Sequence, residues 1–331
     1  MKKVLSIILA IALMLSFSVV AFAATTNTLP AGENGTWTIG KVYKLVSAGT
    51  SPAEDFEFSD PVAVGEAPDD AVTIAPASFQ AGAASENGTA GSFVVSVDVT
   101  KFTKPGVYEY TLKEDSTAAT PGVTYDANSY TLKVTVFNDE TEGAAPGALK
   151  VDTVSLNTVP AEGATSTKVT SIENTYSAGT LKISKTVTGK LGDKTMDFEF
   201  TITFTGGDAN AEYPVNKDSA DGATGNDAAV TTVKSGDTIY LKHGETFIID
   251  NIPYGVEYTV VETAVENYTP TKTNDSGKIE AAEVTAAFTN DYDTTPDTGI
   301  SLDSLPYILI ALVVVAAVIV MLLKKRHNAE V

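Results

Sequence analysis

Residues 198–204 have the sequence Phe-Glu-Phe-Thr-Ile-Thr-Phe, in which every second side chain is apolar. Successive side chains of a β-strand point to opposite faces, so this alternation predicts a strand with one face in a core and the other in water. The same period recurs at 93–97, 108–112, 130–136 and 258–260. Gly, Asn, Asp and Pro separate these segments, and many short strands with such turns predict an all-β protein of antiparallel sandwiches.

The alternating segments fall into two halves that are loosely repeated. The sequence Asp-Phe-Glu-Phe at 55–58, for example, recurs at 197–200. We therefore predict two tandem sandwiches, an N-terminal domain at 24–176 and a C-terminal domain at 177–293. The small residues Ser177-Ala178-Gly179 are predicted to form the hinge between them.

Composition excludes several classes of function. The chain has 22 Lys+Arg against 42 Asp+Glu, a formal net charge of -20, and its only arginine is Arg326. A nucleic-acid binder needs the opposite sign of charge. The absence of cysteine excludes disulfides, thiolate metal sites and cysteine nucleophiles, and the only histidines are His243 and His327. No cofactor and no metal ion is predicted.

The first 23 residues have the features of a secretory signal peptide. Lys2 and Lys3 give a basic start, residues 4–15 are apolar, and Ala21-Phe22-Ala23 is a small-residue cleavage site. The sequence therefore predicts that residues 1–23 direct export of the chain and are then removed.

The C-terminal end has the features of a membrane anchor. Residues 304–323 carry no charge, and the tail at 324–331 begins with Lys324-Lys325-Arg326. Twenty helical residues span roughly 30 Å, the thickness of the hydrocarbon core of a bilayer. Because basic clusters stay in the cytoplasm, we predict a transmembrane helix at 304–323 with both sandwiches outside the cell.

A short motif precedes this segment. Residues 294–299 include Pro296-Asp297-Thr298-Gly299, which resembles a sortase sorting signal, with Thr295 where that signal usually has leucine. By this resemblance a sortase would cut between Thr298 and Gly299, transfer the Thr298 carbonyl to an amine and leave the protein anchored to the cell wall at the surface.

Each predicted domain places a lysine, a glutamate and an asparagine on the apolar faces of its strands. The trios are Lys41, Glu114 and Asn174 in the first domain, and Lys185, Glu262 and Asn290 in the second. Such groups are costly to bury unless they meet one another. Lys44, on the opposite face of the first strand, is an alternative to Lys41, whose face carries more apolar residues.

These three side chains can react with one another. Desolvation lowers the pKa of a lysine and raises that of a glutamate, so both become neutral when buried. A neutral amine is a nucleophile, and a protonated carboxyl can polarise the asparagine carbonyl and shuttle protons as the catalytic group. Attack on the amide with loss of ammonia leaves a Lys–Asn isopeptide bond, which replaces disulfides in a cysteine-free exported protein.

The mature chain resembles the two-domain major pilins of Gram-positive bacteria, the streptococcal T-antigen-like shaft subunits, and its C-terminal domain is similar to collagen-adhesin B-type domains. The turn Pro121-Gly122-Val123-Thr124-Tyr125-Asp126 is a further match. The resemblance implies immunoglobulin-like sandwiches in which an isopeptide bond joins the first and last strands. It implies a structural pilus subunit rather than an enzyme, apart from one self-cross-linking turnover per domain.

A shaft pilin also needs an acceptor lysine for the Thr298 carbonyl of a neighbouring copy. The family pattern places it shortly before the last strand of the first domain, which indicates Lys168, with Lys150 as the alternative. The implied partners are sortase and further copies of this chain in a head-to-tail polymer. Other pilins and a host-surface ligand are left open, as are the class of sortase and a shaft, tip or base position.

Three other functions would account for parts of the sequence. A monomeric, sortase-anchored surface adhesin would share every feature except the acceptor lysine. A secreted hydrolase would need a catalytic constellation, whereas His243 has only a turn context and no Gly-x-Ser-x-Gly motif is present. The Asp/Asn-rich stretch 206–227 lacks the spaced ligands of a calcium loop and is predicted to be a solvated loop.

Overall fold

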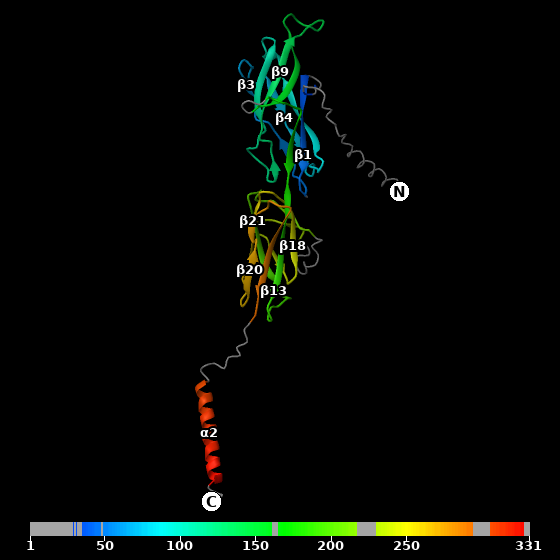
Figure 1. The fold of residues 1–331 in the computed structure, drawn as a ribbon. Helices are drawn as coiled ribbons and strands as arrows, with labels where there is room; N and C mark the ends of the chain where they lie inside the picture. Colours follow the sequence, from blue (N-terminus) through cyan, green and yellow to red (C-terminus); the bar gives the residue numbers. More distant parts are fainter. Residues whose placement is uncertain are drawn as a thin grey trace, which may run out of the picture.

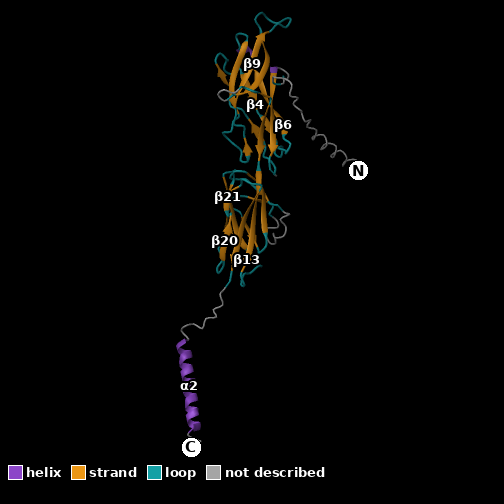
Figure 2. Cartoon of the chain, viewed as in Figure 1, coloured by secondary structure: helices purple, strands orange, loops and turns teal. Residues whose placement is uncertain are grey.

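A computed structural model describes the chain at residues 29, 31, 35–47, 49–160, 165–216, 230–293 and 305–327. Figure 2 shows that both domains consist of strands joined by loops, which confirms the all-β prediction. The predicted signal peptide at 1–23 and sorting motif at 294–299 lie outside the described residues.

The N-terminal domain is a sandwich of two five-stranded sheets. In spatial order the first sheet is β4 (Val72–Ala75), β6 (Thr89–Val97), β1 (Thr36–Leu45), β12 (Ser171–Tyr176) and β8 (Val123–Thr124). The second is β11 (Lys168–Val169), β10 (Leu149–Thr158), β9 (Ser129–Asn138), β7 (Gly106–Lys113) and β3 (Val62–Val64). A separate pair is formed by β2 (Glu54–Phe56) and β5 (Ala77–Phe79), and a 3-10 turn, η2, covers Val99–Lys101.

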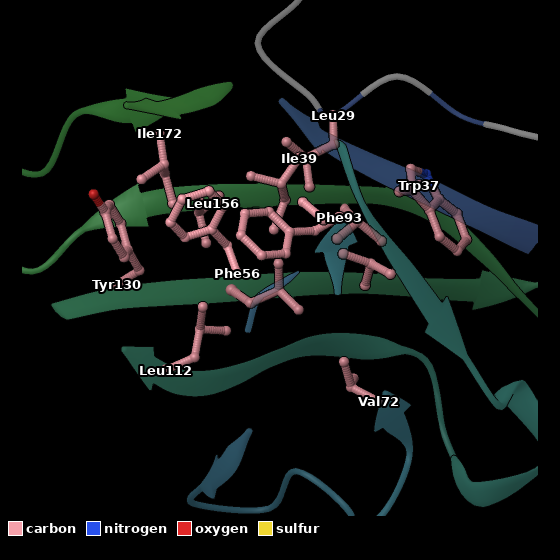
Figure 3. Packing of buried hydrophobic residues seen from close by; sticks show 14 of the residues in the cluster. Leu29, Trp37, Ile39, Phe56, Val72, Phe93, Leu112, Tyr130, Leu156 and Ile172 are labelled. Atoms are coloured by element: carbon pink, nitrogen blue, oxygen red, sulfur yellow. The ribbon is translucent and has the colours of Figure 1, made fainter. Parts of the chain in front are cut away.

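Apolar side chains from both sheets fill the space between them. Figure 3 shows Ile39, Phe56, Phe93 and Leu156 close together in the middle of this cluster, and each of them is almost completely buried. The alternation in the sequence explains the arrangement, because β9 buries every second residue from Tyr130 to Val136.

The C-terminal domain is a smaller sandwich of two four-stranded sheets. In spatial order the first is β18 (Thr246–Pro253), β13 (Ala178–Thr188), β22 (Glu283–Asp291) and β20 (Thr269–Thr273). The second is β17 (Thr238–Leu241), β14 (Phe198–Thr205), β19 (Glu257–Glu262) and β21 (Ser276–Lys278). A separate pair is formed by β15 (Tyr213–Pro214) and β16 (Thr232–Val233).

One strand pair in each domain departs from the antiparallel pattern. The first and last long strands run parallel, β1 beside β12 and β13 beside β22. Parallel neighbours require a long crossover, and here the rest of the domain supplies it. The two chain segments that carry the predicted lysine and asparagine are therefore hydrogen-bonded to each other.

The junction between the domains is the single residue Ser177 between two strands, rather than the hinge expected from Ser177-Ala178-Gly179. Strand β12 ends at Tyr176 and β13 begins at Ala178, so one extended segment runs through both domains (Figure 1). Ala178 is buried, and Ser47 Oγ both accepts from its N–H at 2.7 Å and donates to its carbonyl at 2.6 Å. Small residues serve here for close packing, since a Cβ on Gly179 would lie 2.3 Å from the Ala281 carbonyl oxygen.

Near the C-terminus, helix α2 covers Leu305–His327. Its side chains are described only for Tyr307 and residues 309–321, and these are exposed. Within the part of the chain that the structure describes, no helix is both long and apolar enough to qualify as a membrane span. The transmembrane role predicted for residues 304–323 stays a prediction, and Ser304 itself lies outside the described residues.

Candidate functional site: two buried Lys-Glu-Asn trios

The first trio lies between the two sheets of the N-terminal domain. Lys41 is on β1, Asn174 is on the neighbouring β12, and Glu114 follows directly after β7 of the opposite sheet. Lys41 and Asn174 are 0% exposed and Glu114 is 2% exposed. The sequence placed all three residues on apolar strand faces, and the structure brings them together.

A single carboxylate oxygen joins the members of this trio. Glu114 Oε1 accepts hydrogen bonds from Lys41 Nζ and, at 2.9 Å, from Asn174 Nδ2. The amine and the amide thus converge on the same atom from adjacent strands, which is the placement that a reaction between them requires.

The second trio repeats this arrangement in the C-terminal domain. Lys185 lies on β13, Asn290 on β22, and Glu262 at the end of β19. Glu262 Oε1 accepts from Lys185 Nζ at 2.6 Å and from Asn290 Nδ2 at 2.6 Å. Lys185 is 1% exposed and Asn290 2% exposed.

Strand register gives the two trios the same offset. Lys41 is paired with Ile172, two residues before Asn174, and Lys185 is paired with Phe288, two residues before Asn290. Side chains two residues apart on a strand lie on the same face. Parallel pairing with this offset therefore sets each lysine diagonally beside its asparagine.

Aromatic rings surround both amines. Lys41 Nζ lies 4.3 Å from the centre of the Phe56 ring, and Lys185 Nζ lies 4.2 Å from that of Phe198. These two rings occupy the same place in the repeated Asp-Phe-Glu-Phe sequence. They exclude water from the amines while their faces attract residual positive charge.

Burial changes the protonation of the two lysines. It lowers the pKa of Lys41, an effect that the nearby Glu114 carboxylate only partly offsets. Burial likewise lowers the pKa of Lys185, against the opposing influence of Glu262. Each site therefore favours the neutral, nucleophilic form of its amine more than water does.

The side-chain carbonyl oxygens Asn174 Oδ1 and Asn290 Oδ1 are buried, and neither accepts a hydrogen bond within the described part of the chain. An unsatisfied buried acceptor is unfavourable. Turning the planar amide by half a rotation would instead place Oδ1 against the glutamate oxygen, where a protonated carboxyl could donate to it. The arrangement can thus activate an amide carbon beside an amine.

Lys44, the alternative to Lys41, points away from the core. Its side chain is 40% exposed, and its Nζ lies 3.9 Å from Glu173 Oε1 on the outer face of β12. The structure therefore places Lys41, and not Lys44, with Glu114 and Asn174.

The remaining candidate residues lie away from the trios. Lys168 is exposed on the short edge strand β11, and Lys150 is exposed on β10 with its Nζ 3.7 Å from Asp139 Oδ1. His243 Nδ1 accepts from the Val187 N–H at 2.9 Å, which is a structural contact. Among the described residues no group of acidic side chains and histidines could hold a metal ion.

The sequence gives no sign of one contact at the first trio. The Asp126 N–H donates to Glu114 Oε2 at 2.7 Å. In the sequence Asp126 is only the last residue of a turn that matches the family. A backbone donor leaves no side-chain signature, so no pattern in the sequence could have indicated it.

Both domains of the chain match known families. Residues 39–177 match the family described as Spy0128-like isopeptide containing domain, and residues 179–292 match a domain of unknown function, DUF7601. A pilin of Streptococcus pyogenes serotype M1 is 30% identical over 235 residues, which is 64% of this chain and 65% of the pilin. The pilus tip adhesin Cpa of Streptococcus pyogenes is 35% identical over 133 residues, 37% of this chain and 18% of the adhesin.

Solved structures show the same fold. The major pilin T3.2 of Streptococcus pyogenes serotype GAS13637 superposes with a TM-score of 0.51 at 20% identity, covering 79% of this chain and 99% of that protein. Another major pilin of Streptococcus pyogenes gives 0.50 at 24% identity, covering 78% and 99%. Residues 39–177 are therefore similar to the Spy0128-like isopeptide containing family, and the chain resembles streptococcal major pilins in sequence and in fold while spanning just under two thirds of the length of the curated pilin.

Proposed function

We propose that this protein is a structural subunit of a sortase-assembled surface pilus, and that each of its domains is braced by an autocatalytic Lys–Asn isopeptide bond. The observation that carries the proposal is the doubled trio, in which a buried lysine and a buried asparagine meet at one glutamate oxygen in both domains. A sequence selected only for stability would not bury three polar groups together, because their burial costs free energy. Here three such groups are buried together in both domains, at the same strand register.

The reaction would run from the neutral forms of the lysine and the glutamic acid. The lysine Nζ attacks the asparagine Cγ while the carboxyl proton moves to the amide. The carboxylate then takes a proton from the attacking nitrogen and delivers it to Nδ2. The Cγ–Nδ2 bond breaks, ammonia leaves, and the carboxyl is protonated again. One new amide replaces one primary amide, so no oxidant or cofactor is needed.

Such bonds would give the chain its mechanical role. Lys41 and Asn174 are 174 − 41 = 133 residues apart, and Lys185 and Asn290 are 290 − 185 = 105 residues apart. Each bond would join the first and last long strands of a domain, which are parallel neighbours in the same sheet. A pull along the chain would then pass through the cross-links and the connection at Ser177, without unzipping either sandwich.

The mass of the protein tests the bonds. The exported, processed chain should weigh one ammonia less per domain than its sequence, and the Asn174→Ala and Asn290→Ala variants should each regain one of these deficits. Proteolysis should release branched peptides that contain Lys41 with Asn174 and Lys185 with Asn290. A mass equal to that of the unmodified sequence would refute this part of the proposal.

Polymer formation is the second part of the proposal. Sortase would join Thr298 of one copy to Lys168 of the next, so cell-wall extracts should give a ladder on a denaturing gel. Lys168→Ala should abolish the ladder and Lys150→Ala should leave it, while both variants keep their full ammonia deficit. A ladder that survives in the Lys168→Ala variant would reject this acceptor.

A monomeric surface adhesin is the alternative function, and the similarity of 133 residues to a pilus tip adhesin favours keeping it. An adhesin of this kind would have both internal bonds and a wall anchor. Wild-type cells that show a single wall-linked band instead of a ladder would support it against the pilus subunit.

A further inference from the structure

The two trios differ at the second oxygen of the glutamate. Glu114 Oε2 accepts the Asp126 N–H at 2.7 Å. Glu262 Oε2 is also buried, but it accepts no hydrogen bond from the part of the chain that the structure describes. The first carboxyl group is thus held at both oxygens and the second at only one.

A side-chain network fixes the position of the Asp126 N–H. Asp126 Oδ1 accepts from the backbone N–H of Asn128 at 2.9 Å and from its Nδ2 at 2.6 Å, and the hydroxyl of Tyr130 donates to Oδ2. Tyr130 is a buried residue of β9. The loop that carries the N–H is therefore anchored to the core of the domain.

The two amines also differ in the number of carboxylates around them. The carboxylates of Asp126 and Glu54, in addition to that of Glu114, act against the burial that lowers the pKa of Lys41. At Lys185 the corresponding influence comes from Glu262. The amine of the first trio therefore lies in more negative surroundings than the amine of the second.

We propose that the Asp126 N–H is a positioning group for Glu114 and that, through it, the isopeptide bond of the N-terminal domain forms more slowly than that of the C-terminal domain. This inference rests on the proposed function. The reaction requires a proton to pass from the ammonium to the carboxylate, and a backbone donor on the carboxylate stabilises the charged state. The neutral, reactive pair is therefore rarer in the first trio.

The order of bond formation can be followed within one molecule. The full chain is synthesised in a cell-free reaction, denatured at once in urea, and diluted into buffer to start folding. Samples are quenched over time, and the two branched peptides are quantified by mass spectrometry. Fluorescence of Trp37, the only tryptophan and a buried residue of the first domain, reports folding of that domain separately.

We expect the Lys185–Asn290 peptide to appear about tenfold faster than the Lys41–Asn174 peptide, because one hydrogen bond to a charged group contributes about 1.4 kcal/mol, which corresponds to a tenfold change in rate. Asp126→Ala releases the anchored loop and should bring the first rate toward the second, without changing the second. Asp126→Asn keeps the N–H and one oxygen acceptor, which can serve Asn128 or Tyr130 but not both, so part of the delay should remain.

The pH profile separates this role from a purely structural one. The groups that face the first pair are Glu54, Asp126 and Tyr130. If the Asp126 N–H acts on Glu114 within the reacting pair, the acid limb of the first rate should move in Asp126→Ala and that of the second rate should not. Slower folding would move the fluorescence signal and not this limb.

Equal rates in the wild type, or a first bond that forms faster, would overturn the inference and leave the proposed function standing. A slower first bond in Asp126→Ala, after folding complete by fluorescence, would overturn it as well. The absence of both branched peptides would instead refute the proposed isopeptide bonds.

Discussion

In the N-terminal domain Lys41 and Asn174 meet between two five-stranded sheets, whereas in the C-terminal domain Lys185 and Asn290 meet between two four-stranded sheets. The loops differ as well, and within the described part of the chain only the first glutamate has a backbone donor on its second oxygen. What the domains share is a parallel pair of first and last strands, the same register offset and a phenylalanine ring beside the amine.

The shared features are those that the proposed chemistry needs. Among the features that differ, the backbone donor to Glu114 is the one that we propose to set the rate. Register and rings decide whether an amine, an amide and a carboxyl meet out of water. Sheet size decides how much apolar surface supports them. We therefore predict that both bonds form and stabilise their domains by similar free energies, whereas the two unreacted trios form their bonds at different rates.

Removal of a trio glutamate should have the largest effect. Glu114→Ala or Glu262→Ala would prevent the bond and also leave a buried lysine without its counter-charge. The two losses together amount to about 7 kcal/mol or more of the free energy of unfolding. Denaturant titration and intact mass measure both effects.

The matched control is Glu109→Ala, on the outer face of β7. Glu109 is paired with Lys133 at 2.7 Å, but both side chains are about 40% exposed. Such a pair contributes at most about 1 kcal/mol. A Glu114→Ala variant no less stable than Glu109→Ala, or one with its ammonia deficit intact, would contradict the role of Glu114.

Removal of an asparagine should be the next largest change, and it tests the similarity of the two domains directly. Asn174→Ala and Asn290→Ala would each lose a cross-link that closes a loop of more than 100 residues, which the loop-entropy relation values at about 4–5 kcal/mol. Because the relation is logarithmic, loops of 133 and 105 residues should differ by only about 0.2 kcal/mol. Unequal losses would show that strain or residual structure distinguishes the domains.

A pH dependence should follow from the lowered lysine pKa. In Asn174→Ala, Lys41 stays a free amine, and burial lowers its pKa in the folded protein. At pH values between the pKa of the folded state and that of the unfolded state, the unfolded chain therefore binds more protons than the folded one. Stability then rises with pH in that window. The deficit of this variant relative to the bonded wild type should therefore shrink as the pH is raised toward the ordinary range of lysine. Denaturant titrations across that range measure it, and a deficit that widens with pH would contradict a lowered pKa.

The smallest expected effect concerns the junction. Asn251 lies on β18 and exchanges two hydrogen bonds with Thr50 of the other domain, at 2.8 and 3.1 Å. Its φ of 55° is one that glycine adopts readily, so Asn251→Gly removes the contacts without backbone strain. We expect a loss of about 1–2 kcal/mol in coupling between the domains and no change in mass.

Differential scanning calorimetry should show this loss as a wider separation of the two unfolding transitions. Asn267→Gly is the matched control, because Asn267 has a φ of 70° and is exposed on the surface of the second domain. If both variants behave alike, the junction contacts contribute nothing to the coupling.

The sequence by itself indicated the strands, their faces and the candidate members of both trios, with Lys44 as an alternative to Lys41. Alternation of apolar residues is a local property, and it showed which polar side chains must enter a core. The repeated Asp-Phe-Glu-Phe sequence pointed to a doubled domain, and the structure adds that its first phenylalanine lies against the amine.

Only the tertiary structure decided how these faces meet. It chose Lys41 over Lys44, made the first and last strands parallel, left only Ser177 between the strands of the two domains where a hinge was expected, and gave Glu114 a backbone partner that Glu262 does not have among the described residues. The physical reason is range. Side-chain periodicity is fixed within a few residues. Strand register, strand direction and backbone hydrogen bonds instead join segments that are tens to more than a hundred residues apart, and loops of many different sequences can connect segments that make the same contact.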